Sequence, residues 1–158
     1  MTDSQDFSKP HILVDADACP VKEEVYKVAF RHEVPVTVVS NGGIRIPDHP
    51  LISRIVVPAD PDAADDWIAE RATAACVIIT ADILLAERGV GVDATVLSPT
   101  GKPFTKDSIG SAVATRNLMA ELRVGGDQMG GPAAFKKEDR SRFLQALDTA
   151  LVRLKASR

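Results

Sequence analysis

The chain is poor in cysteine and contains no hydrophobic run long enough to cross a bilayer. Its thiols, Cys19 and Cys76, are too few for a disulfide scaffold, and each lies beside or within an apolar stretch, so we expect reduced core thiols. The first ten residues are polar and lack the apolar segment of a secretory signal. We therefore expect a cytoplasmic protein without membrane association, with a disordered tail over residues 1–9 and a single domain over residues 10–158.

Two common catalytic patterns are also missing. No histidine can be placed beside Cys19, because His11, His32 and His49 look like edge or loop residues, and this disfavours a cysteine nucleophile. The only glycine-rich stretch, 124–135, lacks the Lys-Ser/Thr ending and the preceding strand of a phosphate-binding P-loop. We expect that stretch to be a flap or a linker.

Charge is unevenly distributed along the chain. Residues 1–101 hold 8 Lys and Arg against 16 Asp and Glu, whereas residues 102–158 hold 11 against 6, which together give the overall net charge of −3. An acidic first part suits bound cations, and a basic last part suits contact with a phosphate backbone. Solvated helix faces are the alternative explanation of both surpluses.

The most informative stretch is ILVDADACPV at 12–21, an apolar run that ends in two carboxylates. The run is typical of a buried parallel strand, and Pro20 suits the first turn of a helix that follows. Ligands of open α/β sheets bind at the carboxyl ends of strands, where Asp15 and Asp17 are expected. Two neighbouring carboxylates repel each other, and a divalent cation relieves the repulsion. Alternatively, Asp17 only caps the helix.

Alternation of apolar runs and amphipathic segments predicts an α/β fold. Repeated strand–helix units with right-handed crossovers give parallel strands, so we expect three αβα layers around a mainly parallel sheet. The predicted strands after the first are 34–39, 54–57, 76–80 and 93–97, with a small hairpin ending at Phe104, and the predicted helices are 21–32, 65–75, 83–88, 109–123 and 137–155.

Further polar residues are expected at the same edge of the sheet. Asp82 follows the buried strand 76–80, and Asn41 follows the strand 34–39. Asp65 lies in the first turn of a helix on the side that faces the sheet, and Asp66 lies one step around that helix. Because acidic residues also favour helix starts through the macrodipole, capping is the alternative for this last pair.

Five stretches together resemble the YaiI/YqxD family of bacterial proteins. They are VDADACPVKEEVY (14–26), ADDWIAERA (64–72), VIITADILLA (77–86), GGP (130–132) and DRSRFLQALD (139–148). The resemblance covers nearly the whole chain after residue 10 and implies a PIN-like fold, related to ribonuclease domains whose strand-end acids bind Mg²⁺ or Mn²⁺. No further acid after Asp82 has a clear match, because Asp93 begins a later strand.

This resemblance and the acid pattern predict a metal-dependent nuclease that acts on RNA or another nucleic acid. We expect Asp15, Asp65 and Asp82 to be catalytic, the first and last as direct ligands of Mg²⁺ or Mn²⁺ and Asp65 as a ligand or water-positioning base. Asp17 and Asp66 complete the predicted set of metal-binding carboxylates.

Substrate contacts are predicted from the basic last helix and from one amide. Asn41 is expected to orient the phosphate, and Lys136, Lys137, Arg140 and Arg142 are expected to hold the nucleic-acid backbone. RNA is thus the predicted partner, and the sequence leaves the oligomeric state open.

Two other functions fit the same residues. In a phosphatase of the haloacid dehalogenase type, Asp15 is the nucleophile, Asp17 the general acid and Ser40 a phosphate ligand. That chemistry needs a lysine, and none occurs between Asn41 and Gly101. The other alternative is a PIN-like module that binds RNA or a protein without catalysis.

Overall fold

The structure is a computed structural model that describes residues 7–60, 62–124 and 135–156. Its strands are β1 (His11–Asp15), β2 (Val36–Ser40), β3 (Ile52–Val56), β4 (Cys76–Ile79), β5 (Thr95–Leu97) and β6 (Pro103–Phe104). Its helices are the 3-10 helix η1 (Ala16–Ala18) and the α-helices α1 (Lys22–His32), α2 (Ala63–Arg71), α3 (Ile83–Gly91), α4 (Lys106–Val124) and α5 (Lys137–Ala156). Most of the glycine-rich stretch 124–135 lies outside the described residues.

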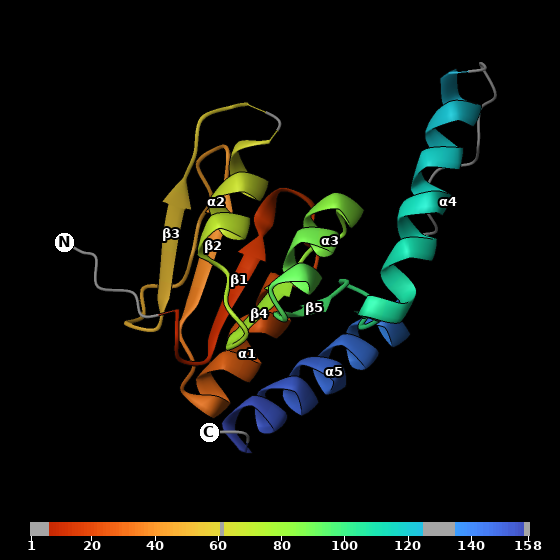
Figure 1. Ribbon diagram of the computed structural model, residues 1–158. Coiled ribbons are helices and arrows are strands. Elements are labelled where there is room, and N and C mark those ends of the chain that lie inside the picture. Colours follow the sequence, from red (N-terminus) through yellow and green to blue (C-terminus); the bar gives the residue numbers. More distant parts are fainter. Residues whose placement is uncertain (1–6, 61, 125–134, 157–158) are drawn as a thin grey trace.

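The strands form one mixed sheet with the order β3-β2-β1-β4-β5-β6 (Figure 1). All neighbouring strands are parallel except β5 and β6, which pair antiparallel as the predicted hairpin. Gly101, with φ +87°, makes the turn of this hairpin, and a Cβ there would lie 2.8 Å from the backbone of α5. The expected α/β fold with a mainly parallel sheet is confirmed.

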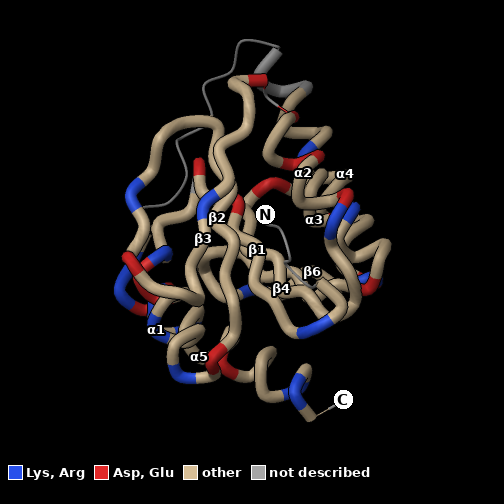
Figure 2. Tube along the Cα trace, turned by 90° about the vertical axis from the view of Figure 1, so that its left-hand side faces the viewer, with Lys and Arg blue, Asp and Glu red and all other residues tan. Residues whose placement is uncertain are grey.

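Helices cover both faces of the sheet, so the fold has three layers (Figure 2). Side chains of β1 alternate between the faces, since Ile12 and Val14 join the core beneath α1 and α5, whereas Leu13 joins the core beneath α2 and α3. A strand buried on both faces needs a continuous apolar sequence, and this is why the central strands contain no alternation of polar and apolar residues.

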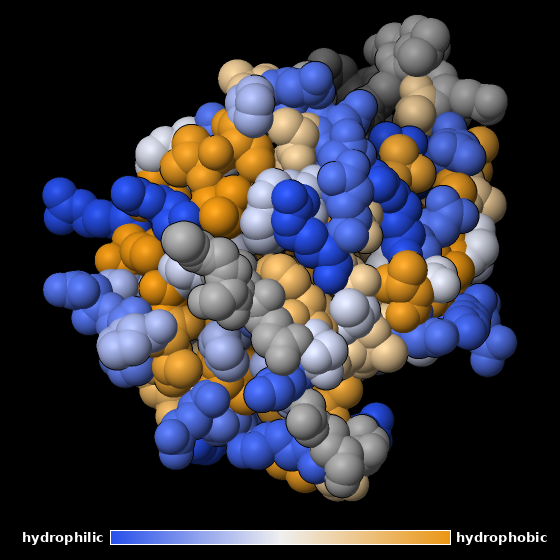
Figure 3. All heavy atoms as spheres, turned by 60° about the vertical axis from the view of Figure 1, so that its left-hand side comes forward, coloured by the Kyte–Doolittle hydropathy of each residue, from blue (hydrophilic) through white to orange (hydrophobic). Residues whose placement is uncertain are grey.

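The surface mixes hydrophilic residues with small hydrophobic groups on the face that Figure 3 shows. Large apolar side chains that stay exposed belong to different elements, for example Val56 on β3 and Leu118 on α4. None of the helices within the described residues is both long enough and apolar enough to cross a membrane.

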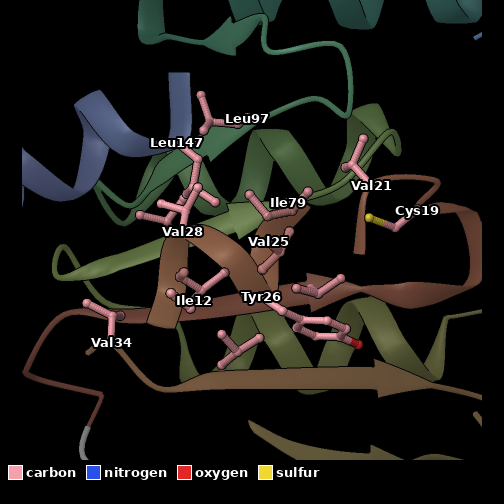
Figure 4. Packing of buried hydrophobic residues seen from close by; sticks show 14 of the residues in the cluster. Ile12, Cys19, Val21, Val25, Tyr26, Val28, Val34, Ile79, Leu97 and Leu147 are labelled. Atoms are coloured by element: carbon pink, nitrogen blue, oxygen red, sulfur yellow. The ribbon is translucent and has the colours of Figure 1, made fainter. Parts of the chain in front are cut away.

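The core between the sheet and α5 is filled by the apolar face of that helix. Phe143, Leu147 and Leu151 are fully buried. Figure 4 shows Val28 of α1 lying between Ile12 of β1 and Leu147 of α5. The helices α1 and α5 therefore form one layer on the same face of the sheet, and they are in direct contact.

The prediction that His11 is an edge or loop residue is wrong. Its ring is buried within β1, where Nε2 lies 2.8 Å from the hydroxyl of Thr37 on the neighbouring strand. Burial lowers the pKa of His11 to about 4, so the ring is neutral at pH 7. The ring of Phe7 lies 4.7 Å from it, so that part of the predicted tail packs on the domain, whereas residues 1–6 lie outside the described part.

Candidate active site

A pocket of about 440 Å³ lies at the carboxyl edge of the sheet. Its polar lining consists of Asp15, Asp17, Asn41, Asp65, Asp82 and Arg116. Figure 2 shows acidic positions in this region between β2 and α2. The structure thus brings together the strand-end acids that the sequence predicted, along with one arginine that it did not.

Strand register explains why these residues meet. In the parallel pairing of β1 with β4, Val14 lies beside Ile79, so the next residues, Asp15 and Thr80, leave the sheet at the same level. On the other side of β1, Asp15 lies beside Val39 of β2. Parallel strands end at a common edge, and residues far apart in sequence therefore share one pocket.

Thr80 holds the Asp15 carboxylate in place. Its hydroxyl donates a 2.8 Å hydrogen bond to Oδ2 of Asp15 and accepts one of 2.9 Å from the backbone N–H of Asp82. Asp15 is only 9% exposed, and this burial raises its pKa, assisted by the charges of Asp82 and Asp17, while the bond from Thr80 lowers it. Thr80 thus fixes one oxygen of Asp15 and links it to the next carboxylate.

Asp82 is both the N-cap of α3 and a wall of the pocket. Its Oδ1 accepts hydrogen bonds from the backbone N–H groups of Leu84 at 2.9 Å and Leu85 at 3.4 Å. These bonds leave its second carboxylate oxygen for other partners. The capping alternative that the sequence raised for other acids is therefore realised at Asp82, without removing it from the pocket.

Asp65 lies in contact with Asp82 inside the pocket. Burial, a hydrogen bond with Asp82 and the charges of Asp82, Asp15 and Asp62 raise the pKa of Asp65 to about 7. Two ionised carboxylates in such contact repel each other, and this repulsion favours the protonated form of Asp65. A divalent cation is the other species that relieves such repulsion.

Asp17 and Asn41 form the more open side of the pocket. Asp17 belongs to η1 and is exposed, and its Oδ2 accepts a 3.3 Å hydrogen bond from the backbone N–H of Asn41. The N-cap of α1 is Val21, which makes no side-chain capping bond. Asp17 therefore does not cap that helix.

Asp66 is not brought to the pocket. Its Oδ1 accepts a 2.7 Å hydrogen bond from Arg88 of α3, and both side chains are about half exposed. Neighbouring residues of a helix point about 100° apart, so Asp65 faces the pocket and Asp66 faces α3 and solvent.

The four basic residues predicted to bind substrate do not line the pocket either. Arg140 donates to the carbonyl oxygen of Pro20 at 3.1 Å and to both carboxylate oxygens of Glu24 at 3.4 Å. Arg142 donates to Asp139 at 3.1 Å, and the side chains of Lys136 and Lys137 are exposed. Their predicted role in holding a nucleic-acid backbone stays a prediction about the surface next to α5.

Arg116 is the residue of this pocket that sequence reasoning missed. It lies in the middle of α4, whose start is fixed to the opposite edge of the sheet by an ion pair of 2.8 Å between Lys106 and Asp93. Asp93 precedes β5 and so lies at the amino edge, as expected. Neither a motif nor its spacing marks Arg116, because only the direction of α4 brings it to the carboxyl edge.

The donor set suits a hard cation held by few protein ligands. All four acids offer carboxylate oxygens, which Mg²⁺ and Mn²⁺ prefer. Within residues 7–60, 62–124 and 135–156, however, no three His, Cys, Asp or Glu side chains converge on one point closely enough to enclose an ion. Mg²⁺ commonly binds through one or two carboxylates and keeps several waters, and a pocket lined by Asp15, Asp65 and Asp82 suits that mode.

Comparison with known proteins identifies a family and no activity. The family described as "Uncharacterized BCR, YaiI/YqxD family" matches residues 13–153. A UPF0178 protein of Sphingopyxis alaskensis is 64% identical over 150 residues, which cover 94% of this chain and 97% of the relative. A UPF0178 protein of Nitrobacter winogradskyi is 58% identical over 144 residues, which cover 91% of this chain and 92% of the relative. No solved structure matches the chain.

Proposed function

The chain belongs to the YaiI/YqxD family, and from this premise we propose that it is a metal-dependent nuclease that hydrolyses phosphodiester bonds of RNA. The observation that carries the proposal is the meeting of Asp15, Asp65 and Asp82 in one pocket at the carboxyl edge of the sheet. None of these three acids forms an ion pair with another residue in the part of the chain that the structure describes, so their negative potential is available to a cation.

In this proposal the pocket binds Mg²⁺ or Mn²⁺, which supplies neutralisation of the phosphate charge and a lowered pKa of bound water. Asp15 and Asp82 would hold the ion, since Thr80 and the start of α3 keep their carboxylates in fixed orientations. Asp65 would position the attacking water and take up its proton at a carboxylate oxygen, since its side chain lines the same pocket. Asp17 and the backbone of Asn41 border the side where substrate enters.

The PIN-like resemblance of the sequence supports a nuclease over the other enzyme class. A haloacid dehalogenase-type phosphatase needs Ser40 to bind phosphate, but Ser40 is 2% exposed and donates its hydroxyl hydrogen bond to the carbonyl oxygen of Gly42. Ser40 does not line the pocket. The missing lysine between residues 41 and 101 weighs against that phosphatase as well.

The test is cleavage of a mixed pool of labelled RNA oligonucleotides by the purified protein with Mn²⁺, Mg²⁺ or EDTA. We expect cleavage with Mn²⁺ that EDTA stops, and a loss of about a hundredfold or more in Asp15→Asn and in Asp82→Asn. Asparagine still accepts a hydrogen bond from Thr80 and still caps a helix, so both variants should fold. Asp66→Asn is the matched control, because it makes the same chemical change at an acid that lies outside the pocket.

Three results would contradict the proposal. Cleavage that persists in both pocket variants would come from a contaminant. RNA binding without cleavage at any metal concentration would favour the non-catalytic module. Release of phosphate from a small phosphomonoester, abolished in Asp15→Asn, would favour the phosphatase.

A further inference from the structure

We propose that Arg116 binds the phosphate of the substrate and holds it against the carboxylates of the pocket. The inference rests on the proposed function for its substrate class, a phosphodiester. Its geometric basis is independent of that function, because Arg116 lines the same pocket as Asp15, Asp17, Asp65 and Asp82.

The path of α4 explains how an arginine reaches this place. α4 begins at Lys106 near the amino edge of the sheet and lies against α3, which runs from the carboxyl edge at Ile83. Ten residues of α-helix span about 15 Å. This length places Arg116 near the start of α3 at the carboxyl edge of the sheet, and Ile83 and Arg116 both line the pocket.

Charge makes a cation at this position significant. The negative charges of the four acids repel a phosphodiester, and a single divalent cation would offset only part of this repulsion. Arg116 is the only basic residue that lines the pocket within the described part of the chain. A guanidinium has a planar set of donors that matches two phosphate oxygens at once.

The arginine also has no competing protein partner among the residues that the structure describes. Several other arginines of the described chain do have acidic partners, namely Arg88 with Asp66, Arg140 with Glu24 and Arg142 with Asp139. Arg116 lies near four acids yet forms no ion pair with any of them in the described part of the chain, and its side chain is exposed. Its donors are consequently available to an anion that enters the pocket.

The first experiment measures binding of a fluorescein-labelled 12-nucleotide oligouridylate in Ca²⁺ and cleavage of the same oligonucleotide in Mn²⁺. Arg116→Ala should weaken binding about tenfold, lower the salt dependence of log K by about 0.7, and reduce cleavage about a hundredfold. Arg116→Lys should retain part of the binding, part of the salt dependence and part of the cleavage. Arg153→Ala is the matched control, since it removes an exposed arginine that does not line this pocket and should change each quantity less than twofold.

The second experiment measures Mn²⁺ affinity without RNA. Removal of a positive charge beside the carboxylates should make Arg116→Ala bind Mn²⁺ about three- to tenfold more tightly, although the same variant binds and cleaves RNA more weakly. A merely structural role predicts the opposite sign, because a disturbed pocket would lose Mn²⁺ as well. Unchanged thermal unfolding of Arg116→Ala would accompany the expected result.

The outcomes separate this inference from the proposed function. If wild-type protein binds the oligonucleotide without cleaving it and Arg116→Ala weakens that binding, the nuclease proposal fails and the phosphate-binding role stands. If wild-type protein cleaves and Arg116→Ala cleaves and binds equally well, the role of Arg116 is overturned and the nuclease proposal stands. Weaker Mn²⁺ binding in Arg116→Ala would also overturn the role of Arg116.

Discussion

Replacing Asp65 with asparagine should make the protein more stable at about pH 8. The pKa of Asp65 is raised to about 7 by burial and by Asp82, whereas in the unfolded chain it returns to about 4. Between these two pH values the folded state retains a proton that the unfolded state has lost. Stability of the wild-type protein should therefore fall as pH rises through this window, and Asp65→Asn should escape that loss.

The magnitude follows from the shift and from the exposure of the side chain. A shift of about three pKa units corresponds to about 4 kcal/mol for a fully buried group. Asp65 is only partly buried, and solvent screening reduces the effect, so we expect Asp65→Asn to gain about 1–2 kcal/mol at pH 8. The gain should shrink as pH is lowered from about 7 to about 4, because protonated aspartate and asparagine are then nearly equivalent.

The assay is urea unfolding of both proteins at several pH values between about 4 and 8. Asp66→Asn is the control, since it removes an exposed ion pair with Arg88 and should cost less than about 1 kcal/mol without this pH dependence. An Asp65→Asn variant that is no more stable than the wild type at pH 8, or whose gain is the same at pH 4, would refute the reasoning.

The other predictions concern three buried positions. Burial lowers the pKa of His11 to about 4, so the unfolded chain binds a proton at His11 before the folded protein does as pH falls. In urea unfolding, the wild type should therefore lose about 2–3 kcal/mol of stability between pH 7 and pH 4, and His11→Asn should not show this loss. Gly89→Ala should destabilise the protein by about 1–3 kcal/mol, because a Cβ there would lie 2.7 Å from a side chain of β4. Gly110→Ala has open space around it and should stabilise its exposed helix by about 0.5–1 kcal/mol. Equal shifts of the thermal unfolding temperature in the two variants would contradict this prediction. Thr80→Val should lower Mn²⁺ affinity about tenfold in calorimetric titration, since Asp15 loses the hydroxyl that orients it, and unchanged affinity would show that this bond is dispensable.

The sequence by itself determined the layers of the fold and two of the acids. Short continuous apolar runs rich in β-branched residues are typical of strands covered on both faces, and parallel connection then places their carboxyl ends at one edge. Asp15 ends β1 and Asp82 lies three residues after β4, so their position at that edge was predictable from local pattern alone. Asn41 follows from the same reasoning at the end of β2.

The sequence favoured Asp65 over Asp66 but kept both as metal-binding candidates, and only the tertiary structure separated the two and revealed Arg116. Both acids occupy the first turn of α2, and the rotation of that helix on the sheet selects which one faces the pocket. Arg116 depends on the path of α4 against α3, and the partner of Asp66 is 22 residues away at Arg88. A local pattern fixes where a residue lies along its own element, whereas the direction of its side chain toward distant residues depends on packing between elements.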